Sequence, residues 1–462
     1  MMKSMTSLRD LRHILRDVLG EDRFVENLEE RLCASYDASR VSVLPDFVVY
    51  PRDTEDVCRV LGACHERNVC VTPRGAGSGL TGGAIPVRHG LVLDFSKMDR
   101  ILEIASSDLV AVAQPGVVVS HLQRAVEKEG LFYPPDPASS EFASLGGTVA
   151  ECAGGLRGLK YGVTRDYILG LEAVLADGNI LRTGCRALKS VTGYDLTRLF
   201  VGSEGTLAVF TEITCKLLPL PSCILTLLAS FPAIEGGLDA ASVVVASRLL
   251  PRALEYMDER CIRCVDDYGD AHFPPEAKSC LLVELDGFDE ESLVRDAKKV
   301  ERICRDQGAL TLERAVDTKA RDGLWAARRA ISPSLYRMSA KKVNEDICVP
   351  RSKMSKMIRE IQQIEREMGL PIVNFGHAGD GNIHVNVMVD KEEEMPRARD
   401  AVKRIFQRAV ALGGTLSGEH GIGLAKASFL SIEVGERELE TMKNIKALFD
   451  PTGILNPGKI FV

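Results

Sequence analysis

Two histidines seven residues apart, His377 and His384, are the clearest candidates for metal ligands in this 462-residue chain. They stand in VNFGHAGDGNIHVNVMV, residues 373–389, where two alternating apolar runs flank the turn sequence AGDGN. This pattern predicts a β-hairpin, which would bring the two imidazoles close together across its strands. Two such imidazoles begin a metal site that needs one or two further ligands. The alternative is two unrelated polar residues at a hairpin.

A glutamate–histidine pair, Glu419 and His420, stands between glycines in GGTLSGEHGIGLAK, residues 413–426. Glycines on both sides favour a loop over a helix. A carboxylate here could complete the metal site of the hairpin, and the adjacent imidazole could act as a base at physiological pH. Taken alone, such a dipeptide is more often solvated surface, so this prediction depends on the histidine hairpin.

The single tryptophan, Trp325, precedes two arginines in LWAARRAISPSL. Arg328 and Arg329 follow it by three and four residues, so on a helix the three side chains would share a face. A guanidinium beside an aromatic ring can bind a carboxylate through a bidentate fork. The competing interpretation is a solvated helix with one packed aromatic residue.

Three glycine-rich windows, 75–83, 146–162 and 202–205, predict close approach of the backbone to a large flat ligand. The first window contains GSGLTG, which fits the dinucleotide fingerprint G-x-G-x-x-G. That fingerprint requires a helix directly after the loop, whereas Pro86 and Gly90 interrupt any helix here and an apolar strand follows. The predicted context is strand–loop–strand, so NAD in a Rossmann fold is excluded. Backbone amides of such loops can still bind a pyrophosphate.

The composition excludes several other classes of protein. A hydrophobic fraction of 45% and a charged fraction of 27% are typical of soluble globular proteins. The net charge of −7 gives no basic face for nucleic acid. No stretch approaches the roughly 20 apolar residues of a membrane helix, and the N-terminus predicts an amphipathic helix rather than a signal peptide. We expect a cytoplasmic protein, with a peripheral position on the inner face of the membrane as the alternative.

Thirteen cysteines, mostly single and in apolar segments, predict reduced thiols rather than disulfides. Cys261 and Cys264 form one CxxC without a second pair, so packing on a helix face is favoured over a metal or redox role. No three or four cysteines stand at ligand spacing, so no Fe–S cluster is expected within the chain.

The alternation of strand and helix patterns suggests where the domains divide. LEAVLADGNILRTG predicts a hairpin at Asp177-Gly178, and the stretch Pro219-Leu220-Pro221 is the best candidate for a domain boundary. Beyond it, strand patterns separated by long helical runs predict an α+β domain built on an antiparallel sheet. Residues 397–449 are patterned mostly as helix, broken by one glycine-rich loop.

Six motifs together make a family resemblance specific: PRGAGSGLTGGAIP, LGGTVAECAGGLRGLKYGVTRDYILGLEAVLADG, VGSEGTLAVFTEITCKLLP, GHAGDGNIHVNV, SGEHGIG and LNPGKIF. In their order the chain, from about residue 40, resembles the glycolate oxidase/D-lactate dehydrogenase group of FAD-linked oxidases, in the vanillyl-alcohol-oxidase flavoprotein superfamily. The resemblance implies an α+β fold with a two-part FAD-binding domain and an antiparallel-sheet substrate (cap) domain. The expected parts are an N-terminal helical segment (1–40), the FAD-binding domain (41–219), the substrate domain (220–412) and a C-terminal helical segment returning to the FAD domain (413–462).

The resemblance implies FAD rather than NAD as the cofactor. The loop 74–83 would wrap the FAD pyrophosphate with backbone amides. We expect non-covalent FAD, although Cys152 stands where many relatives have Asn, and cysteines of such loops attach flavin in part of the superfamily. The residues implied to bind FAD are Pro73, Arg74, Gly75, Ala76, Gly77, Ser78, Gly79, Leu80, Pro135, Ser144, Gly146, Gly147, Thr148, Ala150, Cys152, Gly154, Tyr161, Gly162, Glu204, Gly205, Ile213 and Asn456.

The resemblance also assigns roles to the candidate catalytic residues. It implies a divalent metal (Zn, Fe or Mn) on residues matching His377, His384 and Glu419. It implies His420 as the base, Arg328 as the residue that binds the substrate carboxylate, and Asn386 as a further substrate contact. The implied reaction oxidises a D-2-hydroxy acid to the 2-oxo acid, with the hydroxyl proton taken by His420 and the hydride passed to flavin N5.

The residue at position 344 favours D-lactate or glycolate as the substrate. Relatives acting on D-2-hydroxyglutarate carry a lysine two residues before the position of Asp346, and here that position is Asn344, although Lys341 and Lys342 lie close. D-2-hydroxyglutarate is therefore the alternative substrate. The alternative classes are an alkyl-dihydroxyacetonephosphate-synthase-like transferase and a non-catalytic FAD subunit of a respiratory complex. The expected partners are an electron acceptor (a quinone, a cytochrome, an Fe–S subunit or an electron-transferring flavoprotein) and further subunits in a homodimer or complex.

Overall fold

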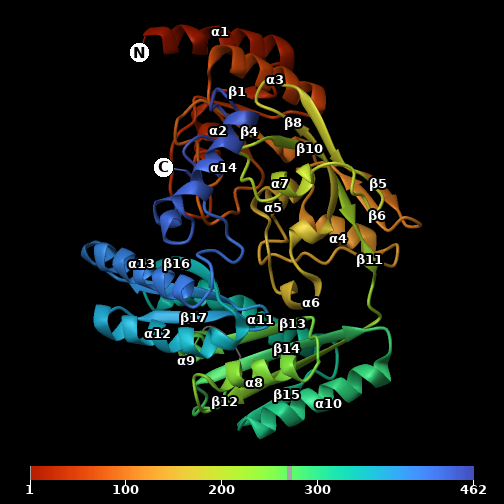
Figure 1. The fold of residues 1–462 in the computed structure, drawn as a ribbon, viewed down its shortest axis with the longest axis vertical. Helices are drawn as coiled ribbons and strands as arrows, with labels where there is room; N and C mark the ends of the chain where they lie inside the picture. The colour runs from red at the N-terminus through yellow and green to blue at the C-terminus, as the bar shows by residue number, and fades with distance from the viewer. Residues whose placement is uncertain (1, 268–272, 462) are drawn as a thin grey trace. The chain divides into compact units, whose positions relative to one another are not determined.

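The structure is a computed structural model that describes residues 2–267 and 273–461. The chain forms two compact units (Figure 1). The first unit consists of Met1–Gly154, Val163–Leu220 and Glu419–Val462, and the second of Gly155–Gly162 and Pro221–Gly418. The chain therefore passes from one unit to the other four times.

The first unit begins with a four-stranded sheet in the order β1-β2-β4-β3. Its strands are β1 (Phe24–Val25), β2 (Phe47–Val49), β4 (Leu91–Asp94) and β3 (Val71–Arg74). The predicted amphipathic N-terminal helix is confirmed as α1 (Met2–Leu19), which buries Leu11, Leu15 and Leu19. It packs on α3 (Thr54–Arg67), which begins where the Asp53 side chain accepts the N–H of Asp56.

The glycine loop after β3 has the predicted strand–loop–strand context. β3 and β4 pair in parallel, and no helix lies between them. A Rossmann unit would need a helix there, so the exclusion of that fold is confirmed.

A second sheet of the first unit is antiparallel, in the order β5-β6-β10-β8-β9. Its strands are β5 (Ile101–Ala105), β6 (Val110–Ala113), β10 (Val209–Lys216), β8 (Ile168–Val174) and β9 (Ile180–Gly184). The hairpin predicted at Asp177-Gly178 is confirmed, because β8 and β9 pair around it and Gly178 has a φ of +85°. A short pair joins β7 (Leu131–Phe132) to β11 (Leu218–Pro219).

The other helices of the first unit are short, apart from the one near its C-terminus. They are α2 (Leu28–Cys33), α4 (Val119–Glu127), α5 (Leu145–Glu151), α7 (Leu196–Phe200) and α14 (Glu436–Phe449), with 3-10 turns η1 (Phe95–Lys97), η2 (Thr164–Tyr167) and η6 (Ala427–Ile432).

The second unit is built on a seven-stranded sheet, in the order β15-β12-β14-β13-β17-β18-β16. Its strands are β12 (Cys223–Phe231), β13 (Ala253–Asp258), β14 (Ser279–Gly287), β15 (Thr311–Arg314), β16 (Lys341–Cys348), β17 (Ile372–His377) and β18 (Asn382–Val389). Every neighbouring pair is antiparallel, which confirms the predicted α+β domain on an antiparallel sheet.

Helices contact both faces of this sheet. Tyr256 points toward the start of α8, where its hydroxyl donates to the carbonyl of Ile234, whereas its neighbour Glu255 faces the other way and meets α11 through Arg328. The helices of the unit are α6 (Gly158–Tyr161), α8 (Gly236–Ala246), α9 (Glu259–Asp266), α10 (Glu290–Asp306), α11 (Thr318–Ser334), α12 (Met354–Met368) and α13 (Met395–Ala411), with η3 (Leu335–Arg337), η4 (Arg351–Lys353) and η5 (Glu392–Glu394).

The cysteine predictions can be compared directly with the structure. All thirteen cysteines are free thiols. Cys261 and Cys264 lie on α9, where Cys261 is fully buried in a hydrophobic cluster, as expected for packing on a helix face. Among the described residues, no helix is both long and apolar enough to cross a membrane.

Candidate functional site

The predicted cofactor loops enclose one cavity within the first unit. Its volume is about 220 Å³, well above the roughly 10–15 Å³ that a cavity needs to hold one water molecule. Most of the predicted FAD residues line it: Pro73, Arg74, Gly75, Ala76, Gly77, Ser78, Gly79, Leu80, Ser144, Gly146, Gly147, Thr148, Ala150, Gly154, Glu204, Gly205 and Asn456. Three segments distant in the sequence, 73–80, 144–154 and 204–205, are thus brought together.

Glycine is required in these loops by close packing. A Cβ on Gly75 would overlap the Ser144 hydroxyl, and one on Gly146 would lie 2.5 Å from Pro115 Cβ. A Cβ on Gly79 would meet nothing within 4 Å, so this backbone faces open space. Ser144 also caps α5 by accepting the N–H of Gly147. The loops therefore form a glycine-lined cradle suited to a flat cofactor with a pyrophosphate.

Arg74 lies in this cradle, but its side chain binds the protein itself. Nη1 donates to the carbonyl of Tyr36 at 2.8 Å and Nη2 to that of Cys33 at 3.3 Å. A pyrophosphate at this loop would accordingly be bound by backbone amides, as expected from the sequence.

Five of the predicted FAD residues do not line the cavity: Pro135, Cys152, Tyr161, Gly162 and Ile213. Ile213 is fully buried within β10. The Tyr161 hydroxyl donates to Asp286 in the second unit at 2.7 Å. Cys152 ends α5 in a left-handed conformation, and burial raises the pKa of its thiol.

Glu419 and His420 lie in a loop of the first unit and line the same cavity. Gly154 permits the close approach of Glu419, since a Cβ at position 154 would lie 2.9 Å from Glu419 Oε2. His420 Nε2 lies 4.0 Å from Glu419 Oε1. The predicted loop therefore carries its carboxylate and its imidazole to the cofactor cavity.

Hydrogen bonds to two acceptors in the first unit hold this loop in place just after His420. The carboxylate of Glu204 accepts the N–H groups of Ile422 and Gly423 at 2.8 and 2.7 Å. The Thr81 carbonyl, at the end of the glycine loop, accepts the N–H of Leu424 at 2.7 Å. Glu204, which is predicted to bind the cofactor, thus also holds in place the loop that carries Glu419 and His420.

A second carboxylate, Glu151, lies beside Glu204. Its Oε2 is buried and has no hydrogen-bond partner among the described residues. Burial, and then the charge of Glu204, raise the pKa of Glu151 well above its ordinary value. Gly421 and Gly83 leave the space that this carboxyl group occupies.

In the second unit, the histidine hairpin is confirmed. β17 and β18 pair antiparallel across the predicted turn. His377 and His384 lie on one face of the sheet, both buried, with ring centroids 5.2 Å apart. The Phe375 ring lies 5.1 Å from that of His384.

Glu255, on the neighbouring strand β13, is a site residue that the sequence analysis missed. Its Oε1 lies 2.7 Å from His377 Nδ1, and its Oε2 accepts from Arg328 Nε and Nη2 at 2.9 and 2.7 Å. Glu255 has 0% exposure. No local spacing marks this residue, because it stands 122 positions before His377.

The predicted helix of Trp325 and the two arginines is α11. Trp325 and Arg328 are both buried and reach the same sheet face, where Trp325 Nε1 donates to Glu284 at 2.6 Å. Arg329 is exposed, so the expected common face holds for only one of the arginines. The helix turns Arg329 outward, because it is displaced by a further 100° from Arg328.

Buried amides complete this face. Asn386 pairs with Asn344 across β18 and β16, and neither Oδ1 has a hydrogen-bond partner among the described residues. Asp346, on the same strand as Asn344, accepts the Gly418 N–H at 2.7 Å and the Ser417 hydroxyl at 3.1 Å. The chain is therefore anchored to the sheet one residue before Glu419.

These donor sets fit the groups that the sequence predicts. Two buried imidazoles, one of them bonded through Nδ1 to a carboxylate, are a common basis for a Zn, Fe or Mn site. The buried Asn386 Oδ1, which has no partner among the described residues, is available to accept a hydrogen bond from a polar ligand or a water molecule.

Two protein families match different parts of the chain. Residues 45–184 match a family described as "FAD binding domain", and residues 220–460 match "FAD linked oxidases, C-terminal domain". The fold is similar to that of a solved structure, p-cresol methylhydroxylase with bound substrate, which superposes with a TM-score of 0.80 at 19% identity, over 99% of this chain and 97% of that one. The chain belongs to the FAD-linked oxidases of the vanillyl-alcohol-oxidase flavoprotein family and is an oxidoreductase.

Curated relatives resemble the chain over most of its length. The glycolate oxidase subunit GlcD of Bacillus subtilis (strain 168) is 44% identical over 98% of this chain and 97% of the relative. The D-lactate dehydrogenase of Archaeoglobus fulgidus is 39% identical over 89% of this chain and 90% of the relative. The predicted family and fold class are thereby confirmed.

Proposed function

We propose that this protein oxidises a small D-2-hydroxy acid, D-lactate or glycolate, to the 2-oxo acid. The names of the relatives, glycolate oxidase subunit and D-lactate dehydrogenase, support this substrate class. The observation that carries the proposal is the sheet face of the second unit, where one carboxylate contacts a guanidinium and an imidazole, and a second imidazole lies beside the first.

FAD in the glycine cradle supplies the hydride acceptor when it is bound. A divalent metal on His377, His384 and Glu419 supplies Lewis-acid polarisation of the substrate hydroxyl. The anchoring of Gly418 by Asp346 supports a role for Glu419 beside the two histidines, because it fixes the residue before it to the same sheet.

The protein's own residues then bind and orient the acid. Arg328 binds the carboxylate of the substrate through its guanidinium fork. Asn386 offers a buried amide to the hydroxyl group. His420 takes the hydroxyl proton while the hydride leaves C2, so that no net charge builds up on the substrate.

A small monocarboxylate is supported by the state of the two nearby lysines. Lys341 is exposed and pairs with Glu392. Lys342 donates to the hydroxyl and the carbonyl of Ser332, at 2.8 and 3.1 Å. Both ammonium groups have partners within the protein, and Asn344 carries no charge to bind a second carboxylate.

Flavin reduction under anaerobic conditions tests the proposal. Glycolate, D-lactate, L-lactate and D-2-hydroxyglutarate are added in turn to the flavin-loaded protein, and the visible flavin band is followed. We expect bleaching by glycolate or D-lactate and a loss of at least about 100-fold in its rate in His420→Ala. The matched control is His121→Ala, an exposed histidine on α4. Bleaching by D-2-hydroxyglutarate alone would contradict the small-acid assignment, and bleaching by none would favour a transferase or a non-catalytic subunit.

The reduced flavin must pass its electrons to a partner. We propose a quinone, an Fe–S subunit or an electron-transferring flavoprotein as the acceptor, met in the cytoplasm or at the inner face of the membrane. An assay of the reduced protein against each class of acceptor tests this choice, and the acceptor that restores the flavin band fastest identifies the class.

A further inference from the structure

Glu255 connects two residues to which the proposed function gives different tasks. One carboxylate oxygen meets His377 and the other meets Arg328, over distances of 2.7–2.9 Å. We propose that Glu255 is a positioning residue that orients a metal-ligating imidazole and the substrate-binding guanidinium together. This inference rests on the proposed function.

The contact with His377 fixes which ring nitrogen can ligate. An imidazole whose Nδ1–H donates to a carboxylate is held in one tautomer and one ring orientation, with Nε2 as the ligating atom. The hydrogen bond also makes the ring a better electron donor. The strand register supports the geometry, because Glu255 is the direct cross-strand partner of His377.

The contact with Arg328 uses only one edge of the guanidinium. Nε and one N–H of Nη2 donate to Glu255, and a guanidinium has five N–H donors in all. The edge formed by Nη1 and Nη2 therefore keeps the fork geometry needed for a second carboxylate. The Phe375 ring lies 4.8 Å from the guanidinium carbon and helps to fix its plane.

Burial makes these contacts rigid and strong. The side chains of Glu255, His377 and Arg328 are 0%, 7% and 9% exposed, so water screens the interactions little. A 2-hydroxy acid carries its hydroxyl on the carbon next to its carboxylate. The spacing between metal and guanidinium thus has to be fixed, and a single carboxylate that contacts both sides fixes it.

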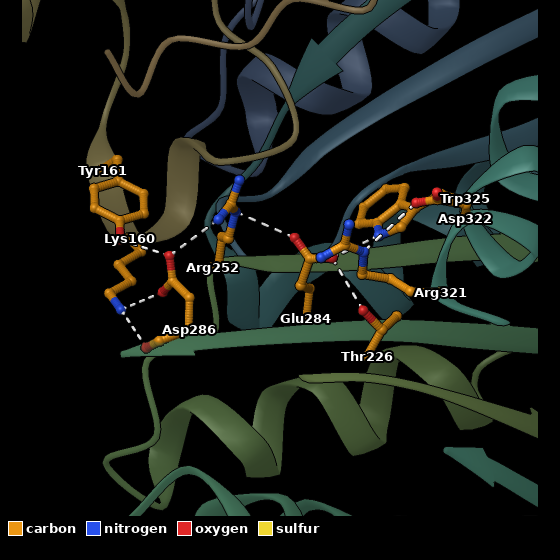
Figure 2. A network of polar contacts seen from close by, with 9 residues as sticks. All are labelled: Lys160, Tyr161, Thr226, Arg252, Glu284, Asp286, Arg321, Asp322 and Trp325. Carbon is orange, nitrogen blue, oxygen red and sulfur yellow. Dashed lines mark hydrogen bonds and ion pairs between the residues drawn. The ribbon is translucent and has the colours of Figure 1, made fainter. Parts of the chain in front are cut away.

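Glu284 provides a matched control on the same sheet face (Figure 2). It is also buried, on the adjacent strand β14, and likewise contacts α11. Its partners are Trp325, Thr226 at 3.0 Å and Arg252 at 3.1 Å, none of which has a task in the proposed reaction. Figure 2 shows this group among Arg252, Asp286 and Lys160.

Zinc affinity is the test. The flavin-loaded wild type, Glu255→Gln and Glu284→Gln are stripped of metal and titrated with Zn²⁺ alone, in competition with a chromophoric chelator. We expect Glu255→Gln to bind Zn²⁺ about 10- to 100-fold more weakly than the wild type, the effect typical of a lost outer-shell carboxylate. Glu284→Gln should stay within about twofold of the wild type.

The outcomes separate this inference from the proposed function. Wild-type affinity in Glu255→Gln would overturn the positioning role and leave the metal site standing. Failure of the wild type to bind Zn²⁺ would overturn both. An equal loss in both variants would indicate a general effect on the sheet and would also overturn the specific role of Glu255.

A measurement on the unaltered Glu255 covers the case in which Glu255→Gln does not fold. In ¹⁵N-histidine-labelled protein with Zn²⁺, the signals of His377 are assigned by comparison with His377→Gln. We expect the proton on Nδ1 and the metal on Nε2. A His377 with the metal on Nδ1 would contradict the inference, because Glu255 could then not hold that nitrogen.

Discussion

Single residues decide the chemistry of this site, and the sequence identified those that local spacing connects. His377 and His384 were predictable because one turn joins their strands, and Trp325 and Arg328 because one helix carries them. Glu255 and Glu151 were not predictable, since their partners come from distant strands and loops. A lone buried carboxylate leaves no periodic signal in a sequence.

Glu151 gives a pH-dependent prediction at this scale. Its pKa is raised in the folded protein. Its favourable contribution to the free energy of unfolding is therefore complete below pH 4.5 and is lost as the pH rises toward the pKa of the folded state. The amide of Glu151→Gln does not titrate. The free energy of unfolding of the variant should therefore rise, relative to that of the wild type, by up to about 1.4 kcal/mol for each pH unit in that window. Melting temperatures of flavin-loaded protein at pH 5.5 and 8 measure this gain.

The control for this prediction is Glu141→Gln, an exposed glutamate of the same unit. It should change the melting temperature little, and equally at both pH values. A Glu151→Gln effect that does not depend on pH would contradict the raised pKa.

At the scale of elements, the loop that carries Glu419 and His420 is held by contacts that no sequence pattern predicts. The antiparallel sheet, the two hairpins and α11 followed from periodicity and turn residues. The strand orders of both large sheets, and the binding of the loop by Glu204 and Thr81, depend on pairing between remote segments. Such pairing is decided by tertiary packing, which local propensity does not encode.

A substitution at Gly423 tests whether these hydrogen bonds to Glu204 and Thr81 are needed. Gly423 has a φ of +50°, and a Cβ there would overlap the Thr81 carbonyl. Gly423→Ala should displace the loop and slow flavin reduction by about 100-fold, as expected for a shift of about 1 Å in a catalytic group. The measurement is the anaerobic bleaching rate with the active acid.

Gly453→Ala is the matched control, because Gly453 has a similar φ of +67° with nothing within 4 Å of a Cβ. It carries the same backbone strain without the clash and should keep the wild-type bleaching rate. Equal rates in Gly423→Ala and the wild type would show that the loop does not need this contact.

At the scale of the whole molecule, the chemistry is divided between two compact units. The cofactor cavity is built within the first unit, and the two histidines lie in the second. The chain passes between the units four times, so neither unit is a continuous stretch of sequence. Sequence motifs lie in both units. The order of residues along the chain, however, does not predict that residues 155–162 belong to the second unit.

This division predicts that metal and flavin can be removed separately. Treatment with a strong chelator should abolish bleaching by the substrate and leave FAD bound, because only one of the three proposed metal ligands, Glu419, lines the cofactor cavity. Flavin retained after gel filtration measures binding, and added Zn²⁺, Fe²⁺ or Mn²⁺ should restore bleaching. Release of FAD together with the metal would contradict this prediction of separate removal.

The most direct test of the central claim is the visible spectrum of the purified holoprotein, recorded anaerobically before and after addition of glycolate or D-lactate. The account predicts an oxidised-flavin spectrum that one of these acids bleaches, with the corresponding 2-oxo acid formed in equal amount. A flavin spectrum that no 2-hydroxy acid changes would contradict it.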